Sequence, residues 1–195
     1  MFLQSGKHVL PSEPSRTKST TQPEPYGVTL RGMVRVIGID PGLRLTGYGV
    51  VDARAGTAEP ALVEAGVIRL SPKLSVEARL VQLHEDLRQL FEETKPEVMA
   101  IEKIYAHYAH PRTAIIMAHA RGVILLAAQQ RGMKIHHLGA NEVKKSLTGH
   151  GHASKEQMQR AVQSQYKLAE LPEPPDVADA IAIATCYARR YGLGG

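Results

Sequence analysis

The pattern of apolar and polar residues becomes regular at about residue 33. Three apolar runs, Val34–Asp40, Gly47–Asp52 and Ala61–Leu70, are joined by short turns and predict the strands of an antiparallel meander. Apolar residues then recur at steps of three and four over 75–94, which predicts an amphipathic helix. A short apolar run over 97–102 predicts a fourth, buried strand.

The second half of the chain alternates between helix and strand. Pro111 suits the first turn of a helix that Gly132 ends, and "KIHHL" at 134–138 predicts a fifth strand. Helices are predicted over 140–147 and 154–168, and a last helix begins after the proline-rich "LPEPP". A meander followed by alternating elements predicts an α/β fold: a five-stranded mixed sheet, antiparallel then parallel, with helices on both faces.

Composition divides the chain into three parts. Residues 1–32 are rich in Pro, Ser, Thr and charge without periodicity and predict a disordered extension, although Met33 is an alternative start. We expect residues 33–190 to form a single domain, because 195 residues with 43% hydrophobic content are enough for one core. Residues 191–195 are expected to be a short tail.

Several classes of protein are disfavoured by what the sequence lacks. It has neither an uncharged apolar run of about 18 residues, as a membrane span needs, nor the apolar block of about 7–15 residues of a secretory signal. Its one cysteine, Cys186, excludes an internal disulfide and suits a reducing compartment. We therefore expect a cytoplasmic protein without a membrane partner.

Charge is unevenly distributed over the last third of the chain. Residues 134–167 carry six Lys and Arg against two Glu, a net +4, whereas residues 168–195 carry two Arg against four acids, a net −2. A basic segment beside an acidic one suits a protein that grips phosphates while it holds cations. Uneven surface charge without a function is the open alternative.

Four acids stand where strands end or a helix begins. Asp40 and Glu102 each end an apolar strand, the place where α/β sheets form their sites. Asp176 and Asp179 lie three residues apart at the start of the last helix, and this spacing puts both on one face. Acids at a helix start also suit the helix dipole or a cap, so a purely structural role stays open for this pair.

If these carboxylates converge, they need cations. Four like charges in a small space repel one another, and bound divalent metal is the usual remedy. Oxygen ligands suit Mg²⁺ or Mn²⁺ better than Zn²⁺. Two such ions activate a water and stabilise the leaving oxygen in phosphodiester hydrolysis, so the pattern predicts a metal-dependent nuclease.

Five motifs in order resemble a known family. "VIGIDPGLRLTGYGVV", "AIEKIY", "ARGVILLAA", "NEVKKSLTGHGHASKEQMQ" and "DVADAIAIA" are similar to motifs of RuvC-type Holliday-junction resolvases, and the resemblance runs from about Met33 to Arg189. It implies a ribonuclease H-like fold and a homodimer. It also implies symmetric cleavage of four-way DNA junctions with two Mg²⁺ or Mn²⁺ ions, in recombination and repair, and a branch-migration motor complex as partner.

The resemblance also implies roles for particular residues. The metal-binding and catalytic acids are Asp40, Glu102, Asp176 and Asp179; some family members have His where Asp176 stands. Lys155 is implied as catalytic and, with Lys144, as a phosphate contact. Tyr105 takes the place of an aromatic residue, commonly Phe, that contacts bases near the junction centre.

Two further patterns keep alternatives open. The helix within 113–130 is apolar almost all round, so it is either fully buried or half-buried with a dimer interface, which the resemblance favours. Four histidines invite a zinc site: His136, His137, His150 and His152. This is disfavoured because adjacent residues in a strand point to opposite faces and no cysteine is near. His107 and His110 are expected beside Tyr105, facing DNA.

Three rival functions remain to be weighed. A nuclease of the same fold that acts on structured RNA shares the first motif, but "DVADAIAIA" and the Tyr105 segment argue against it. A nucleotide-binding module of the actin and sugar-kinase type needs two similar domains and a much longer chain. A non-catalytic junction-binding protein is expected to lack some of the four acids, and this chain keeps them all.

Overall fold

The computed structural model describes residues 32–103 and 111–192. The strands in these two stretches are β1 (Met33–Asp40), β2 (Leu45–Arg54), β3 (Ala61–Arg69), β4 (Val98–Glu102) and β5 (Lys134–Leu138). The helices are α1 (Val76–Thr94), α2 (Pro111–Gln130), α3 (Ala140–Thr148), α4 (Lys155–Tyr166), α5 (Pro175–Tyr187) and a final π-helical turn, η1 (Ala188–Gly192). The predicted order of elements is confirmed.

Most boundaries lie within one or two residues of the predicted ones, and two differences lie in the C-terminal part of the chain. The helix predicted over 154–168 ends at Tyr166, because Lys167 adopts the left-handed conformation with φ 52° and closes the helix. The π-helical turn was not expected from the sequence, and it includes Tyr191 and Gly192, which the sequence assigns to the tail. Residues 1–31 of the predicted extension lie outside the described part of the chain.

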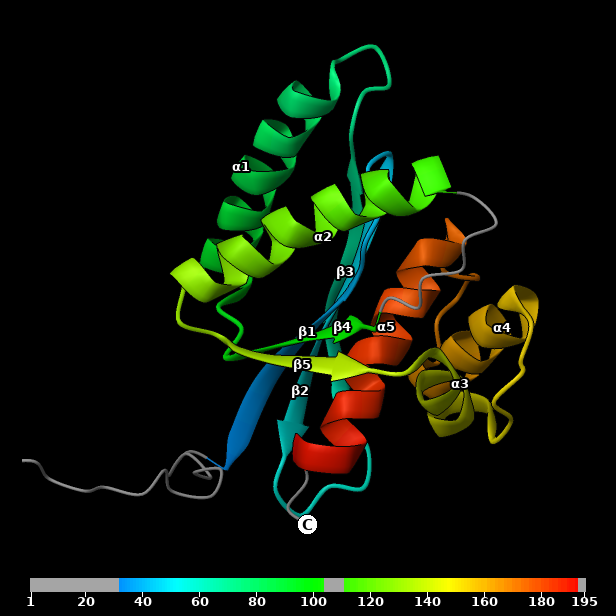
Figure 1. Ribbon diagram of the computed structural model, residues 1–195. Coiled ribbons are helices and arrows are strands. Elements are labelled where there is room, and N and C mark those ends of the chain that lie inside the picture. Colours follow the sequence, from blue (N-terminus) through cyan, green and yellow to red (C-terminus); the bar gives the residue numbers. More distant parts are fainter. Residues whose placement is uncertain (1–31, 104–110, 193–195) are drawn as a thin grey trace, which may run out of the picture.

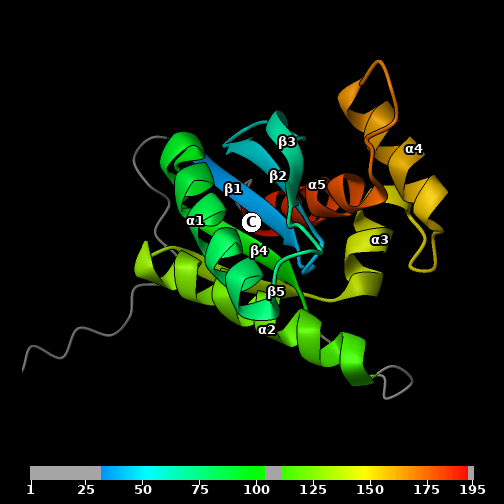
Figure 2. The same cartoon turned by 90° about the horizontal axis from the view of Figure 1, so that it is seen from above.

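The sheet has the order β3-β2-β1-β4-β5. β1 pairs antiparallel with β2 and β2 with β3, whereas β1–β4 and β4–β5 are parallel. Helices α1 and α2 cover one face, and α3, α4 and α5 lie on the other (Figures 1 and 2). The predicted mixed sheet between two helical layers is confirmed. Among the helices described, none is long and apolar enough to cross a membrane.

Each face of the sheet has its own buried core. Ile37 and Ile39 of β1 pack with Leu87 of α1, while Val36 packs on the other face with Ile183 of α5. All five side chains are fully buried. Because neighbouring residues of a strand point to opposite faces, the apolar run of β1 serves both layers, which is why it does not alternate with polar residues.

Glycines allow α5 to lie directly on the backbone of β1 and β2. A Cβ atom added at Gly38 would lie 2.2 Å from the carbonyl oxygen of Ala180, and one at Gly47 would lie 2.1 Å from that of Asp176. At Gly49 the nearest atom, the Cα of Ile181, would be 2.7 Å away. Any larger residue at these positions would push α5 away from the sheet, so the glycines set the position of its acids.

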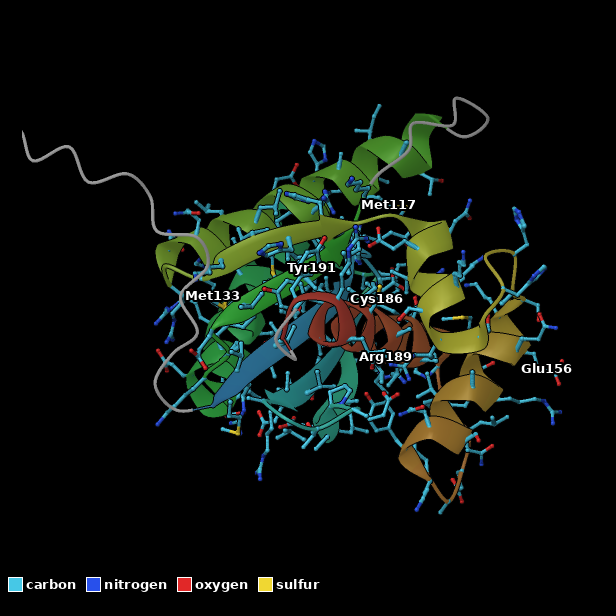
Figure 3. The ribbon with its side chains drawn as sticks, turned by 90° about the horizontal axis from the view of Figure 1, so that it is seen from below. Met117, Met133, Glu156, Cys186, Arg189 and Tyr191 are labelled. Carbon is cyan, nitrogen blue, oxygen red and sulfur yellow. The ribbon has the colours of Figure 1, made fainter. Side chains whose placement is uncertain are left out.

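The C-terminal turn ties α3 and α4 to the rest of the domain. Arg189, labelled in Figure 3, donates from Nε to Glu59 Oε2 at 2.8 Å and from Nη2 to Gln165 Oε1 at 3.1 Å. Its Nη1 donates to the backbone carbonyl of Ser146. One guanidinium group therefore joins the turn after β2 to α3 and α4, the two helices that carry the predicted phosphate-binding lysines.

Candidate active site

Asp40 and Glu102 end neighbouring parallel strands. The last residues paired between β1 and β4 are Ile39 and Ile101, so each acid follows its strand by one step at the same edge of the sheet. The chain turns away sharply after Asp40, because Thr46 Oγ1 donates to the carbonyl oxygen of Gly42 at 2.6 Å and closes the turn. The predicted convergence of the two strand-end acids is confirmed.

Asp176 and Asp179 face the same site from α5. The helix begins at Pro175 and its N-cap is Pro174, without a side-chain capping bond, so Asp176 is not the cap. Both acids are half-buried, whereas the neighbouring Val177 is buried. The structural explanation of Asp176 as a cap is therefore wrong, and the predicted placement of the two acids on one face is confirmed.

The electrostatics of Asp40 show that the four acids converge. Burial raises the pKa of its carboxyl group to about 8, and the negative charges of Asp179, Asp176 and Glu102 add to the rise. Lys155 acts in the opposite direction and lowers the pKa. Because all four other groups act on one carboxyl group, the structure brings together five of the predicted site residues.

The other acids show the same balance of burial and charge. Burial and the charge of Asp179 raise the pKa of Glu102, while Lys144 and Arg121 oppose the rise. Burial also raises the pKa of Asp179, which Lys155 and Lys144 counteract. The site is thus a cluster of acids with cations beside it, as the uneven charge of the sequence predicts.

Local structure places the two lysines. Ser154 caps α4: its Oγ accepts from the backbone N–H of Gln157 at 3.2 Å, and Gln157 Oε1 accepts from the N–H of Ser154 at 2.8 Å. Lys155 is therefore the first residue of α4 and is exposed beside the acids. Lys144 is half-buried on α3, whereas its neighbour Lys145 is exposed.

Arg121 of α2 belongs to the site although the sequence did not single it out. Its Nη1 donates to the backbone carbonyl of Glu102 at 2.6 Å, and its Nη2 donates to Nδ1 of His137 at 2.6 Å. Burial, and then Arg121 and Lys103, lower the pKa of His137, which suits an unprotonated acceptor. The available signal was a charged residue within an otherwise apolar helix segment.

The histidines are placed as their strand position predicts. The ring of His136 lies 4.6 Å from that of Tyr187 on α5, while His137 contacts Arg121 on α2, across the sheet. The rings of His150 and His152 lie 6.0 Å apart in the loop before α4. Tyr105, His107 and His110, predicted to contact DNA, lie outside the described residues.

Helix α2 has one buried and one exposed side. Ala120 and Ile124 are fully buried, whereas Ile115 and Leu126 on the other side are 57% and 53% exposed. Of the two alternatives for this apolar helix, the half-buried one is therefore correct for the isolated chain. The exposed apolar side is available for a partner.

Fold and site together define the class of protein. A mixed sheet of this order, with four acids gathered where its central strands β1 and β4 end and lysines beside them, is a ribonuclease H-like nuclease domain. A sequence profile described as crossover junction endodeoxyribonuclease RuvC matches residues 36–187. The chain belongs to this family of metal-dependent nucleases.

Individual relatives are similar over most of the chain. The crossover junction endodeoxyribonuclease RuvC of Rhodopirellula baltica is 46% identical over 77% of this chain and 84% of its own length. That of Caldicellulosiruptor saccharolyticus is 40% identical over 79% and 92%. The structure of Thermus thermophilus RuvC in complex with Holliday junction substrate matches with a TM-score of 0.72 and 34% identity, covering 80% of this chain and 95% of that one.

The donor set fits divalent metal. The converging groups are carboxylates, and burial together with the charges of the neighbouring acids raises the pKa of Asp40, while Lys155 lowers it. In the described part of the chain, no group of three or more His, Cys, Asp or Glu side chains is placed so that it could hold a metal ion as it stands. Oxygen donors of this kind suit hard divalent cations.

Proposed function

We propose that this protein resolves Holliday junctions: it binds four-way junction DNA and cuts two opposing strands by hydrolysis. The observation that carries the proposal is the convergence of four carboxylates and Lys155 on one edge of the sheet, in a chain of the RuvC family. Thermus thermophilus RuvC, with the same fold, is described in complex with a Holliday junction substrate. Neither the RNA-directed nor the non-catalytic alternative has support from these relatives.

Asp40, Glu102, Asp176 and Asp179 would hold the metal, for which we propose two Mg²⁺ or Mn²⁺ ions. When bound, such ions activate the attacking water and stabilise the oxygen that leaves phosphorus. Glu102 is well suited to hold its position, because Arg121 fixes the backbone at the end of β4. The water adds to phosphorus, the bond to the 3′ oxygen breaks, and the cut strand carries a 5′ phosphate.

The cationic residues would hold the DNA. The charge of Lys155 acts on both Asp40 and Asp179, so we assign Lys155 to the cleaved phosphate, where negative charge develops during hydrolysis. Lys144, near Glu102, would bind a phosphate of the same strand. Tyr105 is proposed to stack on a base near the junction centre, from its place in the motif.

Paired cleavage requires two sites related by symmetry. We propose a homodimer formed through the exposed side of α2, where Ile115 and Leu126 present apolar surface. Leu126→Glu would then shift the protein to a monomer in sedimentation experiments and abolish paired cuts. A Leu126→Glu protein that remains dimeric would contradict this interface. We also propose that the protein works with a branch-migration motor complex. A cytoplasmic location is proposed as well, and the free Cys186 is consistent with it.

Asp40→Asn tests the proposed activity. On a synthetic four-way junction with Mg²⁺, cleavage should fall by at least about 100-fold, because one acid of the metal site is lost. Junction binding should persist, since Asp40 contributes no positive charge to the interface. Full cleavage by this variant would overturn the proposed site, and cleavage of structured RNA in preference to junctions would favour the rival nuclease.

A further inference from the structure

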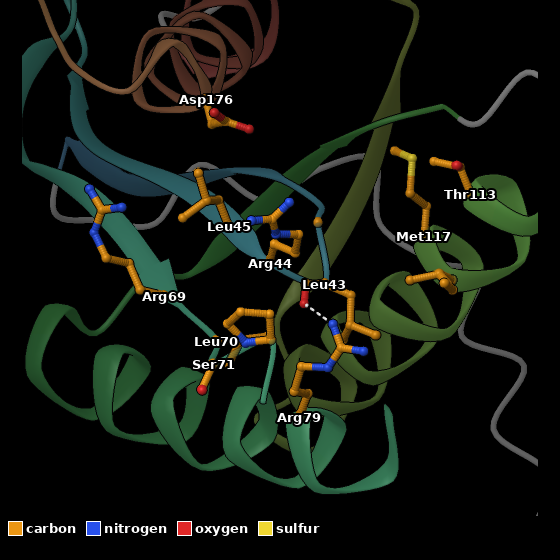
Figure 4. A pocket seen from close by; sticks show the side chains of 13 residues that line it. Leu43, Arg44, Leu45, Arg69, Leu70, Ser71, Arg79, Thr113, Met117 and Asp176 are labelled. Carbon is orange, nitrogen blue, oxygen red and sulfur yellow. Dashed lines mark hydrogen bonds between the residues drawn. The ribbon is translucent and has the colours of Figure 1, made fainter. Parts of the chain in front are cut away.

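A cavity beside the acids extends away from the site along α1 and α2. Its volume is about 930 Å³, at the upper end of the range for ligand pockets. Asp176 is one of its lining residues, so the cavity borders the proposed active site. The remaining wall comes from the turn after β1, the end of β3 and the first turns of α2; Figure 4 shows these segments around the cavity.

Three arginines from separate elements line this cavity. Arg44 comes from the turn before β2, Arg69 from the end of β3 and Arg79 from α1 (Figure 4). In the part of the chain that the structure describes, none of the three forms an ion pair with a carboxylate, unlike the paired Arg35 and Arg131. The cavity is therefore positively charged next to an acidic site.

Arg79 is the most enclosed of the three. Its Nη1 donates to the carbonyl oxygen of Leu43 at 3.1 Å, the dashed line in Figure 4, which fixes the guanidinium group against the turn. Its Nε is buried and has no hydrogen-bond partner among the described residues. A buried, unpaired donor of a charged group costs free energy, so an acceptor at this position would be stabilising.

The rest of the lining is mainly apolar. Leu43, Leu45, Leu70 and Pro72 line the cavity between the arginines, and Met117 lines it on the side of α2. An intact duplex presents mainly phosphates on its outside, so it would gain little from the apolar part of this surface. It suits a strand that has left its duplex, whose sugars and bases pack on apolar side chains while its phosphates bind arginine.

We infer that this cavity binds the DNA strand leading away from the cleaved phosphate, with its phosphates on Arg44, Arg69 and Arg79 and an unpaired nucleotide on the apolar wall. This inference rests on the proposed function, because it takes the junction strand as the occupant. It adds a second anchoring surface, separate from Lys144 and Lys155 on α3 and α4. The strand would thus be held on both sides of the acids.

The salt dependence of junction binding measures these contacts. Arg44 and Arg69 are exposed and their side chains make no hydrogen bond among the described residues, so Arg44→Gln and Arg69→Gln should leave the fold intact. For a strand that has left its duplex, each lost phosphate contact should reduce the slope of log K against log salt by about 0.7, and the double variant by about 1.4. Affinity of the double variant at moderate salt should fall by about tenfold or more.

Arg88→Gln is the matched control. Arg88 is exposed on the same helix as Arg79 and does not line the cavity, so this change should leave the slope unaltered. Junctions with a single uncharged methylphosphonate near the cleaved position locate the contacts. At the correct phosphates, the wild-type protein should lose affinity while the Arg44→Gln/Arg69→Gln protein loses none.

Two outcomes separate this inference from the proposed function. If the wild-type protein binds and cuts junctions but the double variant keeps the wild-type slope, the cavity is not a strand-binding site and the resolvase function stands. If the wild-type protein neither binds nor cuts junctions, the proposed function itself fails. A double variant that loses affinity equally at every methylphosphonate position would also overturn the assigned contacts.

Discussion

The backbone of Asp176 lies directly against Gly47. A Cβ atom at residue 47 would be 2.1 Å from the carbonyl oxygen of Asp176, far inside contact distance. Gly47 pairs with Asp40 across β1 and β2, so this single glycine sets the separation between the acid that ends β1 and the acid that begins α5. The glycine-rich motif after Asp40 therefore acts on the site through packing as well as through the turn.

Gly47→Ala should harm stability and activity together. The added methyl group would push the start of α5 outward, and overpacking of this kind costs about 3 kcal/mol. Urea unfolding would show the loss, and junction cleavage should fall because Asp176 moves. Gly151→Ala is the control, because its Cβ would meet nothing closer than 3.4 Å and stability should hardly change. Wild-type stability of the Gly47→Ala protein would contradict the close approach.

Asp40 should make the metal-free protein less stable as pH rises. Its pKa is about 8 in the folded state and about 3.9 when unfolded, so the folded protein favours the protonated acid. The stabilisation is complete below about pH 4 and is lost as pH rises through about 8, a change of at most about 6 kcal/mol. Urea unfolding in EDTA over pH 5–8.5 would measure it.

The Asp40→Asn variant distinguishes the contribution of Asp40 to the pH dependence of stability from that of the other three acids. An uncharged amide cannot ionise, so the variant should show a flatter pH dependence and exceed wild-type stability above about pH 8 in EDTA. Mg²⁺ should stabilise the wild-type protein more than the variant, because it offsets the negative charges. If the unfolding free energies of the two proteins changed with pH in parallel, Asp40 would not be a buried acid with a raised pKa.

Lys155→Gln should reduce cleavage much more than binding. If Lys155 stabilises charge that develops on the cleaved phosphate, its loss should lower the cleavage rate by about 100-fold. Affinity for the junction, measured without Mg²⁺, should fall only as expected for one phosphate contact. Lys145→Gln, an exposed neighbour of Lys144, should leave the rate near wild type. If the cleavage rate and the affinity fell by the same factor, Lys155 would only bind DNA and would not stabilise the transition state.

Arg189 should be important for stability although it lies away from the acids. It bonds to groups on three different segments, so Arg189→Ala leaves several partners unpaired and should cost about 2–3 kcal/mol. Arg160→Ala removes only an exposed pair with Glu156 on α4, worth at most about 0.5 kcal/mol. Thermal unfolding of both variants tests the difference, and equal small shifts would show that the Arg189 contacts carry little energy.

Much of this fold can be predicted from local patterns. The apolar runs and helical periodicity lead to the correct order of strands and helices, because each core face is built from regularly spaced side chains. The acids can be located because Asp40 and Glu102 end their strands and Asp176 and Asp179 share a helix face. These are relations between near neighbours in sequence, or between the ends of paired strands.

The rest depends on contacts that no local pattern encodes. Arg121 on α2 reaches the backbone of Glu102 at the end of β4, and Arg189 reaches Glu59 across 130 positions of the chain. The arginine-lined cavity likewise joins segments that meet only in the folded sheet. An isolated arginine in a sequence is usually a solvated surface residue, so a role can be assigned to it only when the structure shows its partner.

The central claim is that this chain makes paired, metal-dependent cuts at a four-way junction. The most direct measurement is cleavage of a synthetic junction, labelled in turn on each strand, by the purified protein with Mg²⁺. We predict cuts at symmetric positions on two opposing strands, each leaving a 5′ phosphate, and no such cuts by Asp40→Asn. Scattered nicks that occur equally on linear duplex DNA would contradict the claim.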